Sequence, residues 1–257
     1  MNLKCLASHI WANRKGANPI QVYAAALRTL PGPAEWNRWF PAFFSEEQAR
    51  ILRFAREEDR FSRAVSHMLV STLLGERLQL RYEELIFRRN GYGKPYLDQP
   101  GAPAFNLSHS GRVVVCAAAD SEVGIDVERI EPLDRATLQT MLGPEAAERT
   151  KRMTETETID FFYGRWTLLE SWLKAEGTGL NNKHTLETFA PRFDGESWVI
   201  DPGKPEGTSW ALARLAVDSP FPERYALAVC RKPQESLPDH VQFIEVPELI
   251  ARFRALL

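Results

Sequence analysis

Helix-like segments followed by strand-like segments occur twice along this sequence, and this order constrains the fold more than any other feature. In the first round, Ser45 and Gln48 predict a capping box at the start of the helix "SEEQARILRFA". A second helix is predicted over about residues 60–80, where apolar residues recur at helical spacing. Strands separated by turn residues are then predicted at "LIFRR", "AFNLS", "RVVVCAAA" and "VGIDVERI".

The second round follows "EPLD" and has the same order. A short helix is predicted at "GPEAAERTKR" and a long one at "ETIDFFYGRWTLLESWLKAEG", which Gly177 ends. Strands are predicted at "TLETFAPRF", "SWVIDP", "TSWALARLAV" and "RYALAVC", and a terminal helix at "PELIARFRALL". Because the strands read as antiparallel, we expect an α+β fold of two related lobes, residues 1–127 and 128–257, although no internal repeat is strong enough to prove the relationship.

Composition excludes several classes of protein. The chain has 257 residues, and its 44% hydrophobic content is ample for a core. Lys plus Arg is 32 against 34 for Asp plus Glu, so the net charge of −2 argues against general nucleic-acid binding, although a local basic patch stays open. The longest apolar run, residues 113–119, is too short to cross a membrane, and the N-terminus lacks a signal-peptide pattern. With three cysteines and no CxxC motif, we expect a cytoplasmic protein with no membrane partner.

Two acids end the strand predicted at "VGIDVERI". Side chains alternate along a strand, so Asp126 and Glu128 share one face, and we expect Asp126 to face solvent in a cleft. Like charges held this close repel unless a cation lies between them, and a divalent cation is the common remedy. Solvated acids at a strand end are the alternative, and this pair alone is a weak motif.

The long second-half helix carries another cluster. Trp166, Glu170 and Lys174 stand four residues apart and therefore line one face of the helix. Glu170 is a third candidate acid, and Lys174 is a candidate cation beside it. An ordinary Glu–Lys pair on the surface explains the same spacing, and composition does not choose between the two readings.

Four stretches in a fixed order, "GYGKPYL", "FNLSHS", "VGIDVE" and "FFYGRWTLLESWLKAEGTGL", resemble the 4′-phosphopantetheinyl transferases of the surfactin-synthetase type. That family pairs a G-[IV]-D-x-E strand with a W-[ST]-x-K-E helix some 40 residues later, and Asp126 and Trp166 are 40 residues apart. The resemblance runs from about residue 46 to residue 230. It implies two pseudo-twofold-related α+β lobes with the active site in the cleft between them.

The resemblance also implies an activity. The family transfers the 4′-phosphopantetheine group of coenzyme A, as co-substrate, to a serine hydroxyl of an apo acyl or peptidyl carrier protein and releases adenosine 3′,5′-bisphosphate. Such carriers serve fatty-acid, polyketide or nonribosomal-peptide synthesis. Positioning and neutralisation of phosphate charge dominate this chemistry, which suits Mg²⁺ held by carboxylates. We expect a monomer.

Residue roles carry over by position. Asp126, Glu128 and Glu170 match the metal-binding acids of the family, and Glu170 is also the expected general base. The catalytic set is therefore Asp126, Glu170 and Lys174. The positions expected to bind coenzyme A are Arg50, Lys94, Ser108, His109 and Lys174. Taken singly, His109 reads as a structural histidine and "GKP" as a turn, so these assignments depend on the resemblance.

The sequence departs from the family pattern at several places. Leu169 replaces a lysine that precedes the metal-binding Glu, and we expect position 169 to face the cleft, with Arg165 as a substitute cation. Ser62 stands where relatives carry Arg, with Arg63 beside it. Residues 10–44 form a longer leading segment than the family requires. These departures leave two alternatives, a coenzyme A-binding relative with reduced or lost activity and a non-catalytic protein that docks carriers.

Overall fold

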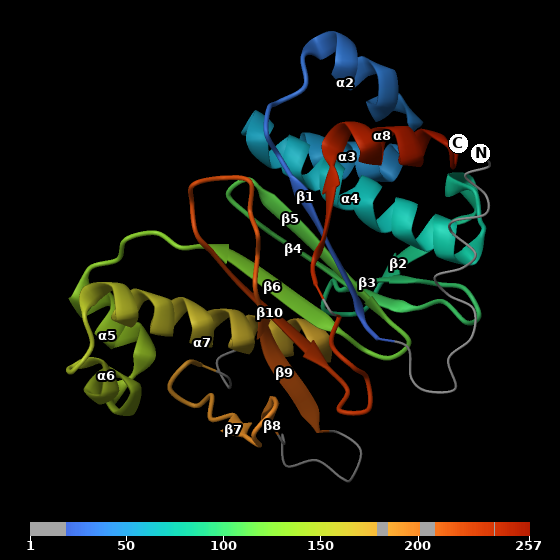
Figure 1. Cartoon of the computed structure of the whole chain (residues 1–257). Helices are drawn as coiled ribbons and strands as arrows, with labels where there is room; N and C mark the ends of the chain where they lie inside the picture. Colours follow the sequence, from blue (N-terminus) through green and yellow to red (C-terminus); the bar gives the residue numbers. More distant parts are fainter. Residues whose placement is uncertain (1–18, 179–184, 201–208, 239) are drawn as a thin grey trace.

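The chain folds into four layers, helix–sheet–sheet–helix, in a computed structural model that describes residues 19–178, 185–200, 209–238 and 240–257 (Figure 1). Helix α4 covers the outer face of one sheet, and helix α7 covers the outer face of the other. The inner faces of the two sheets pack against each other. This mixed architecture confirms the predicted α+β class.

The first sheet has the strand order β11-β1-β5-β4. Strand β1 pairs with β11 in parallel, and the pairs β1–β5 and β5–β4 are antiparallel. Its strands are β1 (Gln21–Ala26), β4 (Ala104–Ser110), β5 (Val113–Ala119) and β11 (Gln242–Glu245). A separate hairpin precedes β4 in the chain, and its strands are β2 (Phe87–Arg89) and β3 (Pro95–Leu97).

The second sheet has the order β6-β10-β9-β8-β7 and is antiparallel throughout the described pairs. Its strands are β6 (Gly124–Arg129), β7 (Arg192–Phe193), β8 (Trp198–Ile200), β9 (Trp210–Leu215) and β10 (Tyr225–Arg231). The residue at which one lobe gives way to the other stays a prediction. The strand pairings themselves place β6 in the second sheet and the late strand β11 in the first.

The helices flank these sheets. The first sheet carries α2 (Pro33–Trp39), α3 (Ser45–Leu52), α4 (Glu57–Leu78) and α8 (Val246–Arg254), and the second carries α5 (Arg135–Leu142), α6 (Pro144–Thr150) and α7 (Glu155–Glu176). Helices α4 and α7 have 22 residues each. No helix of the described residues is both long enough and apolar enough to span a membrane.

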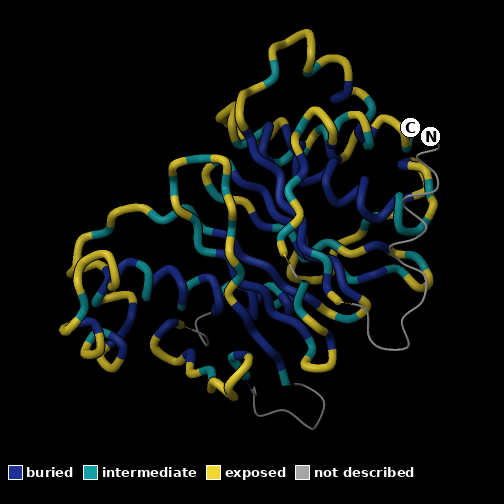
Figure 2. Tube along the Cα trace, in the orientation of Figure 1, coloured by how far each residue is buried: buried dark blue, intermediate teal, exposed yellow. Residues whose placement is uncertain are grey.

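Alternation along the strands creates the three cores. Val123, just before β6, and Ile125 and Val127 within it point into the inter-sheet layer, whereas Gly124 and Asp126 point towards α7. Figure 2 shows the buried chain concentrated in the strands and in the inward faces of the two long helices. Because each sheet is apolar on both faces, the polar groups of β6 are confined to the α7 side.

Several local predictions were wrong. Helix α3 begins at Ser45 itself without a side-chain cap, and Gln48 donates instead to the carbonyl oxygen of Phe43 at 2.7 Å. Strand β1 and helix α2 occupy part of the leading segment, where Trp36 and Trp39 pack into the first core, and residues 10–18 with Trp11 lie outside the described residues. The stretch "TLETFAPRF" contributes only the two residues of β7. These elements depend on tertiary packing, which overrides weak local patterns.

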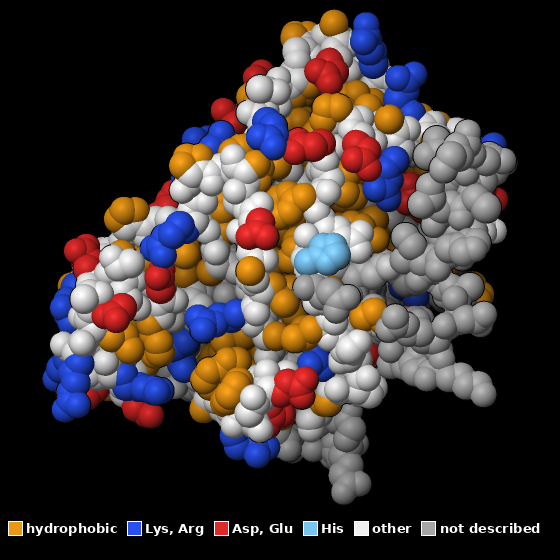
Figure 3. All heavy atoms as spheres, in the orientation of Figure 1, with side chains coloured by type: hydrophobic (Ala, Val, Ile, Leu, Met, Phe, Trp, Pro, Cys, Tyr) orange, Lys and Arg blue, Asp and Glu red, His pale blue; other side chains and the backbone are white. Residues whose placement is uncertain are grey.

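The surface mixes charges of both signs. On the face that Figure 3 shows, Lys and Arg side chains alternate with Asp and Glu, and neither sign forms a continuous field. This distribution agrees with the net charge of −2. A local concentration of charged side chains lies between strand β6 and helix α7.

Candidate active site

Strands β4 and β6 meet at the seam between the two sheets through side chains. Three polar side chains that alternate along β4 accept hydrogen bonds from backbone N–H groups of β6. These are Asn106 from Ile125 at 2.9 Å, Ser108 from Val127 at 3.3 Å and Ser110 from Arg129 at 3.0 Å. The alternating polar residues of "NLSHS" therefore join the two sheets. They accept hydrogen bonds from backbone N–H groups of β6 that have no neighbouring strand on the side facing β4.

Gly124 brings β6 close to α7. A Cβ atom at this position would lie 1.9 Å from the carbonyl oxygen of Ser171, so only glycine permits this approach. The contact sets the next outward residues of β6, Asp126 and Glu128, against the helix face that carries Glu170 and Lys174. The glycine of "GIDVE" is thus a packing requirement of the site.

Asp126 lies at the centre of this arrangement. Lys174 Nζ is 2.5 Å from Asp126 Oδ1, and the Ser108 hydroxyl donates to the same oxygen at 2.9 Å. Asp126 is 2% exposed, so the prediction of a solvent-facing acid was wrong. Burial raises the pKa of Asp126, although Lys174 and Ser108 oppose this effect. Its second oxygen, Oδ2, is buried and has no hydrogen-bond partner among the described residues.

Glu128 and Glu170 complete the acidic cluster. Ser110 donates to Glu128 Oε2 at 2.8 Å, and the nearby Trp166 side chain favours the charged form of Glu128. Burial, followed by repulsion from the charge of Asp126, raises the pKa of both glutamates. Glu170 Oε1 is buried without a hydrogen-bond partner in the described part of the chain.

These residues fit a hard divalent cation by chemistry. Within residues 19–178, 185–200, 209–238 and 240–257, no three His, Cys, Asp or Glu side chains are already arranged to hold a metal. Two buried carboxylate oxygens nevertheless lack partners, Asp126 Oδ2 and Glu170 Oε1, and carboxylates are the ligands that Mg²⁺ prefers. In their present positions, the ammonium group of Lys174 supplies the positive charge of the cluster.

Ser108 and His109 differ in their capacity to bind a ligand. The Ser108 hydroxyl donates to Asp126 and accepts from both Val127 and Lys174, so its hydrogen-bonding capacity is filled. His109 points to the exposed side of β4. Partial burial of its ring lowers the pKa of His109, and the positive charges of Lys174 and Arg63 lower it further. His109 therefore lies in the field of both cations.

A hollow of about 420 Å³ beside His109 gathers further positive charge. We call it the arginine pocket after Arg50, Arg63 and Arg89, which line it. The buried carboxylate of Glu47 holds two of them, with Arg63 Nη2 at 2.6 Å and Arg50 Nη1 at 3.4 Å. Burial and repulsion from Arg63 and Arg50 lower the pKa of Arg89. The lining holds four arginines, Arg50, Arg63, Arg88 and Arg89, against two acids, Glu46 and Glu47, and this excess of positive charge makes the pocket suited to an anion.

Of the residues that line this pocket, the sequence indicated Arg50 as a coenzyme A-binding residue but did not indicate Glu47 or Arg89. Glu47 looked like an ordinary acid in the first turn of a helix, and Arg89 like a solvated residue before a turn. Arg63 belongs to the run of basic residues on the first helices that could bind the 3′-phosphate or a carrier helix, and it also adjoins Ser62. Nothing in their spacing indicates that they meet, because they come from α3, α4 and β2.

Two family models match adjoining parts of the chain, which together span residues 30–230. The model described as 4′-phosphopantetheinyl transferase, N-terminal, matches residues 30–121, and the model described as 4′-phosphopantetheinyl transferase superfamily matches residues 122–230. The second match contains both β6 and α7. The chain belongs to the 4′-phosphopantetheinyl transferase superfamily. It is a transferase of the surfactin-synthetase type, as its motifs predicted.

Relatives in this superfamily cover most of the chain. The 4′-phosphopantetheinyl transferase Sfp of Bacillus subtilis is 27% identical over 221 residues, which are 86% of this chain and 96% of that protein. The transferase ffp of the same species is 27% identical over 90% of this chain and 100% of its own length. A similar protein of Rattus norvegicus, L-aminoadipate-semialdehyde dehydrogenase-phosphopantetheinyl transferase, is 26% identical over 83% of this chain and 75% of its own.

The expected phosphate contact at Lys94 of this transferase stays a prediction. Lys94 Nζ donates to the Ala175 carbonyl oxygen at 2.9 Å and pairs with Glu122 at 2.7 Å. Asn90 donates to the carbonyl oxygen of Gly177 at 3.1 Å from the same loop. The "NGYGKP" loop therefore caps the C-terminus of α7, where carbonyl groups lack partners within the helix.

The family lysine position, Leu169, was predicted to face the cleft, and this prediction was wrong. Leu169 is fully buried in the second core beside Trp172 and Leu173. Arg165 does not substitute for the missing cation, because its guanidinium donates to the carbonyl oxygens of Leu186 and Phe189. Successive residues of an α-helix lie about 100° apart around its axis. Glu170 therefore lies on the polar side of α7 although its neighbour Leu169 lies in the core.

Replacing Leu169 with lysine is expected to destabilise the transferase by roughly 3 kcal/mol, since a charge would replace an apolar side chain in a closed core. A thermal melt run beside calorimetric titration with coenzyme A measures both consequences. Leu169→Met, which keeps the apolar character, serves as the control. Unchanged stability with tighter binding in the lysine variant would show that position 169 reaches the ligand after all.

His67 of the transferase is expected to make stability depend on pH. It is buried beside Tyr82, whose hydroxyl lies 2.8 Å from Nε2, and beside Glu47 at 3.9 Å. Burial, with repulsion from Arg63 and Arg50, lowers the pKa of His67 to about 4, although Glu47 opposes this. Below about pH 6.5, His67 therefore binds a proton in the unfolded chain but stays neutral in the folded protein.

This difference stabilises the fold fully above about pH 6.5 and is lost as the pH falls towards 4, by up to about 3 kcal/mol. Urea unfolding at pH 7 and at pH 5 measures the slope. His67→Gln should flatten it, whereas the same change at exposed His240 should not. Identical slopes in all three proteins would mean that His67 is charged in the folded state.

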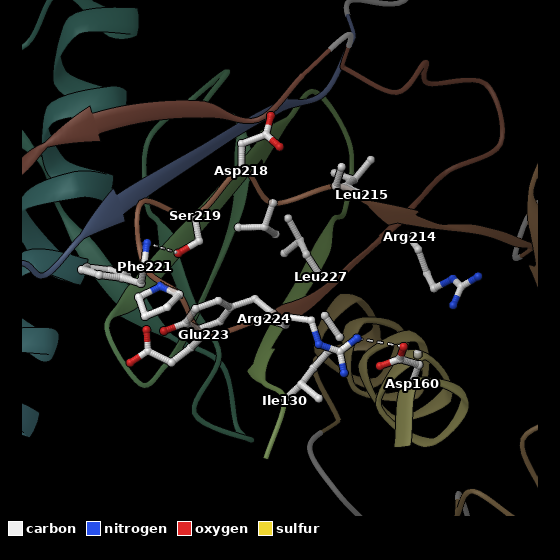
Figure 4. Close-up of a pocket in the computed structure, with 16 residues that line it drawn as sticks. Ile130, Asp160, Arg214, Leu215, Asp218, Ser219, Phe221, Glu223, Arg224 and Leu227 are labelled. Atoms are coloured by element: carbon white, nitrogen blue, oxygen red, sulfur yellow. Dashed lines mark hydrogen bonds and ion pairs between the residues drawn. The ribbon is translucent and has the colours of Figure 1, made fainter. Parts of the chain in front are cut away.

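A second hollow, of about 710 Å³, lies at the β9–β10 hairpin (Figure 4). Asp160 of α7 pairs there with Arg224 at 2.9 Å, and Phe221 of the hairpin loop stacks under Arg112 at 3.7 Å. The hollow shares no residue with the acidic cluster. The arginine pocket also lacks residues of that cluster, but it has an excess of arginines, whereas Arg224 in this hollow is paired with Asp160.

Proposed function

We propose that this transferase moves the 4′-phosphopantetheine group of coenzyme A to a serine hydroxyl of an apo carrier protein and releases adenosine 3′,5′-bisphosphate. One observation carries the proposal. A single face of α7 presents Glu170 and Lys174 to Asp126 and Glu128 of β6, and His109 lies in the field of both Lys174 and Arg63, a residue of the arginine pocket. Carboxylates for a metal and cations for phosphates thus occur side by side.

The cations bind the anionic parts of coenzyme A. Lys174 and His109 are placed for the pyrophosphate, because they lie beside the acidic cluster. The arginine pocket suits the ribose 3′-phosphate, a dianion that bidentate guanidinium groups bind well. Arg63 and Arg89 then compensate for Ser62, whose hydroxyl is buried and has no hydrogen-bond partner in the described residues.

Glu170 is proposed as the general base. The carrier hydroxyl attacks the β-phosphorus, the bond from that phosphorus to the bridging oxygen breaks, and the hydroxyl proton passes to Glu170. The raised pKa of Glu170, caused by burial and by Asp126, moves it towards neutral pH, where a base is most effective.

Asp126, Glu128 and Glu170 are the residues that would hold Mg²⁺. Mg²⁺ held by these carboxylates would supply neutralisation of the negative charge on the pyrophosphate. Ser108 and Ser110 orient the first two carboxylates by donating hydrogen bonds to them.

The direct test is the mass of a purified apo carrier protein incubated with the transferase, coenzyme A and Mg²⁺. We expect the carrier to gain the mass of phosphopantetheine, with no gain after the metal is chelated or when the carrier serine is replaced by alanine. A panel of carriers from fatty-acid, polyketide and nonribosomal-peptide synthesis would identify the preferred class. Binding of coenzyme A without transfer to any of them would favour a relative that has lost activity.

That alternative has less support than the sequence suggested. It was motivated partly by Leu169, yet this residue lies in the core and removes no charge from the carboxylate cluster. All three acids and Lys174 are brought together. A monomeric state and a cytoplasmic location are part of the proposal and are tested by light scattering and by fractionation of cells.

A further inference from the structure

Lys174 occupies a position that its expected role does not explain. Its Nζ atom lies 2.5 Å from Asp126 Oδ1 and 2.9 Å from Ser108 Oγ, which points it into the acidic cluster. A lysine that served only to bind a phosphate would have no need of these partners. The side chain is 29% exposed, so its outer part borders solvent.

Two buried oxygens beside this ion pair remain without partners. Asp126 is 2% exposed and its Oδ2 has no hydrogen bond in the described residues, and the same is true of Glu170 Oε1. Buried polar atoms of this kind are rare and call for a missing partner. The cluster thus holds one resident cation and has free acceptors for another.

We propose that Lys174 holds the place of the divalent cation in the empty enzyme, and that its ammonium group leaves Asp126 when the metal and the pyrophosphate enter. This inference rests on the proposed function. One carboxylate oxygen does not pair closely with an ammonium group and a metal ion at once, because the two cations repel each other at that distance. Lys174 and the metal therefore compete for Asp126.

The released lysine has a destination. Its flexible stem of four carbons and its partial exposure let the ammonium group turn without movement of α7. The pyrophosphate of coenzyme A brings negative charge to the same place, so it draws Lys174 away from Asp126. Coenzyme A then strengthens metal binding in two ways, by adding ligands and by removing a competitor.

Titration with Mn²⁺ in the absence of coenzyme A tests the competition, with free Mn²⁺ read by electron paramagnetic resonance. Lys174→Met keeps the apolar stem and removes the charge, and it should bind Mn²⁺ about 10- to 100-fold more tightly, the strength of a charge-assisted hydrogen bond. Lys151→Met is the matched control. Lys151 lies at the end of α6, away from the residues assigned to the site, and pairs with Glu148 at 2.5 Å on the surface, so its loss should change the affinity little.

The second measurement repeats the titration with saturating coenzyme A. The affinity gain that coenzyme A causes should be at least tenfold larger in the wild type than in Lys174→Met, because only the wild type loses a competitor. If Lys174 only contacts phosphate, coenzyme A will increase the Mn²⁺ affinity of the wild type by no more than it increases that of Lys174→Met. Lys174→Gln repeats both arms with a polar neutral side chain, and thermal melts confirm folding.

The outcomes separate the two ideas. The competition is overturned if the wild type and both Lys174 variants bind Mn²⁺ with equal affinity. The proposed function still stands in that case if the wild type modifies the carrier. Tighter Mn²⁺ binding in Lys151→Met to the same extent would reduce the effect to general electrostatics and would also overturn the competition. Absence of Mn²⁺ binding in every protein, with or without coenzyme A, would overturn both the competition and the metal-dependent part of the proposed function.

Discussion

Asp126→Asn is expected to lower the rate of phosphopantetheine transfer by at least about a thousandfold, since metal-ion stabilisation of a phosphoryl transition state is worth several kcal/mol. The amide keeps the shape of the carboxylate but loses its charge. Carrier modification followed by mass spectrometry measures the loss. Binding of Mn²⁺ without coenzyme A should fall in parallel.

The fold should survive this change with a melting temperature close to that of the wild type. Burial raises the pKa of Asp126, which means that the charged form costs free energy in the folded state. Neutralising it removes this cost, while Lys174 is partly exposed and finds water instead. Glu122→Gln, which alters an exposed acid just before β6, is the matched control. Undiminished transfer by Asp126→Asn would refute the metal assignment.

Glu170→Gln is expected to slow transfer by at least about a hundredfold, a typical contribution of a general base. Glutamine fills the same space but cannot take the proton. Coenzyme A binding should be retained, because its phosphates contact the cations and not this side chain in our proposal. Single-turnover kinetics beside calorimetric titration separates the two effects.

The pH profile distinguishes a base from a structural residue. The pKa of Glu170 is raised, so the wild-type rate should fall with decreasing pH from a point above the ordinary range of a glutamate. The variant should lose this limb of the profile. Glu176→Gln, at the end of the same helix and bonded to Trp210 Nε1 at 3.1 Å, should keep it. A normal rate in Glu170→Gln would leave position 170 without a role in proton transfer.

Local patterns predicted the regular elements well where apolar periodicity was strong. Helices α4 and α7 and strands β4, β5 and β6 lie where their patterns placed them, because each buries an apolar stripe or face of its own. The capping box at Ser45 failed for a different reason. Phe44 precedes the helix, and Gln48 finds carbonyl partners in the turn before it.

The sequence by itself determined the class of fold, the family and the polar faces of β6 and α7, since a periodicity of two or of about 3.6 fixes which residues share a face. The tertiary structure alone decided the burial of Asp126, the core position of Leu169 and the meeting of Arg50, Arg63 and Arg89. A pattern states which side chains point the same way but not what covers them. Layers from distant segments supply that cover, and with it the raised pKa values and the charge partners on which the proposed chemistry depends.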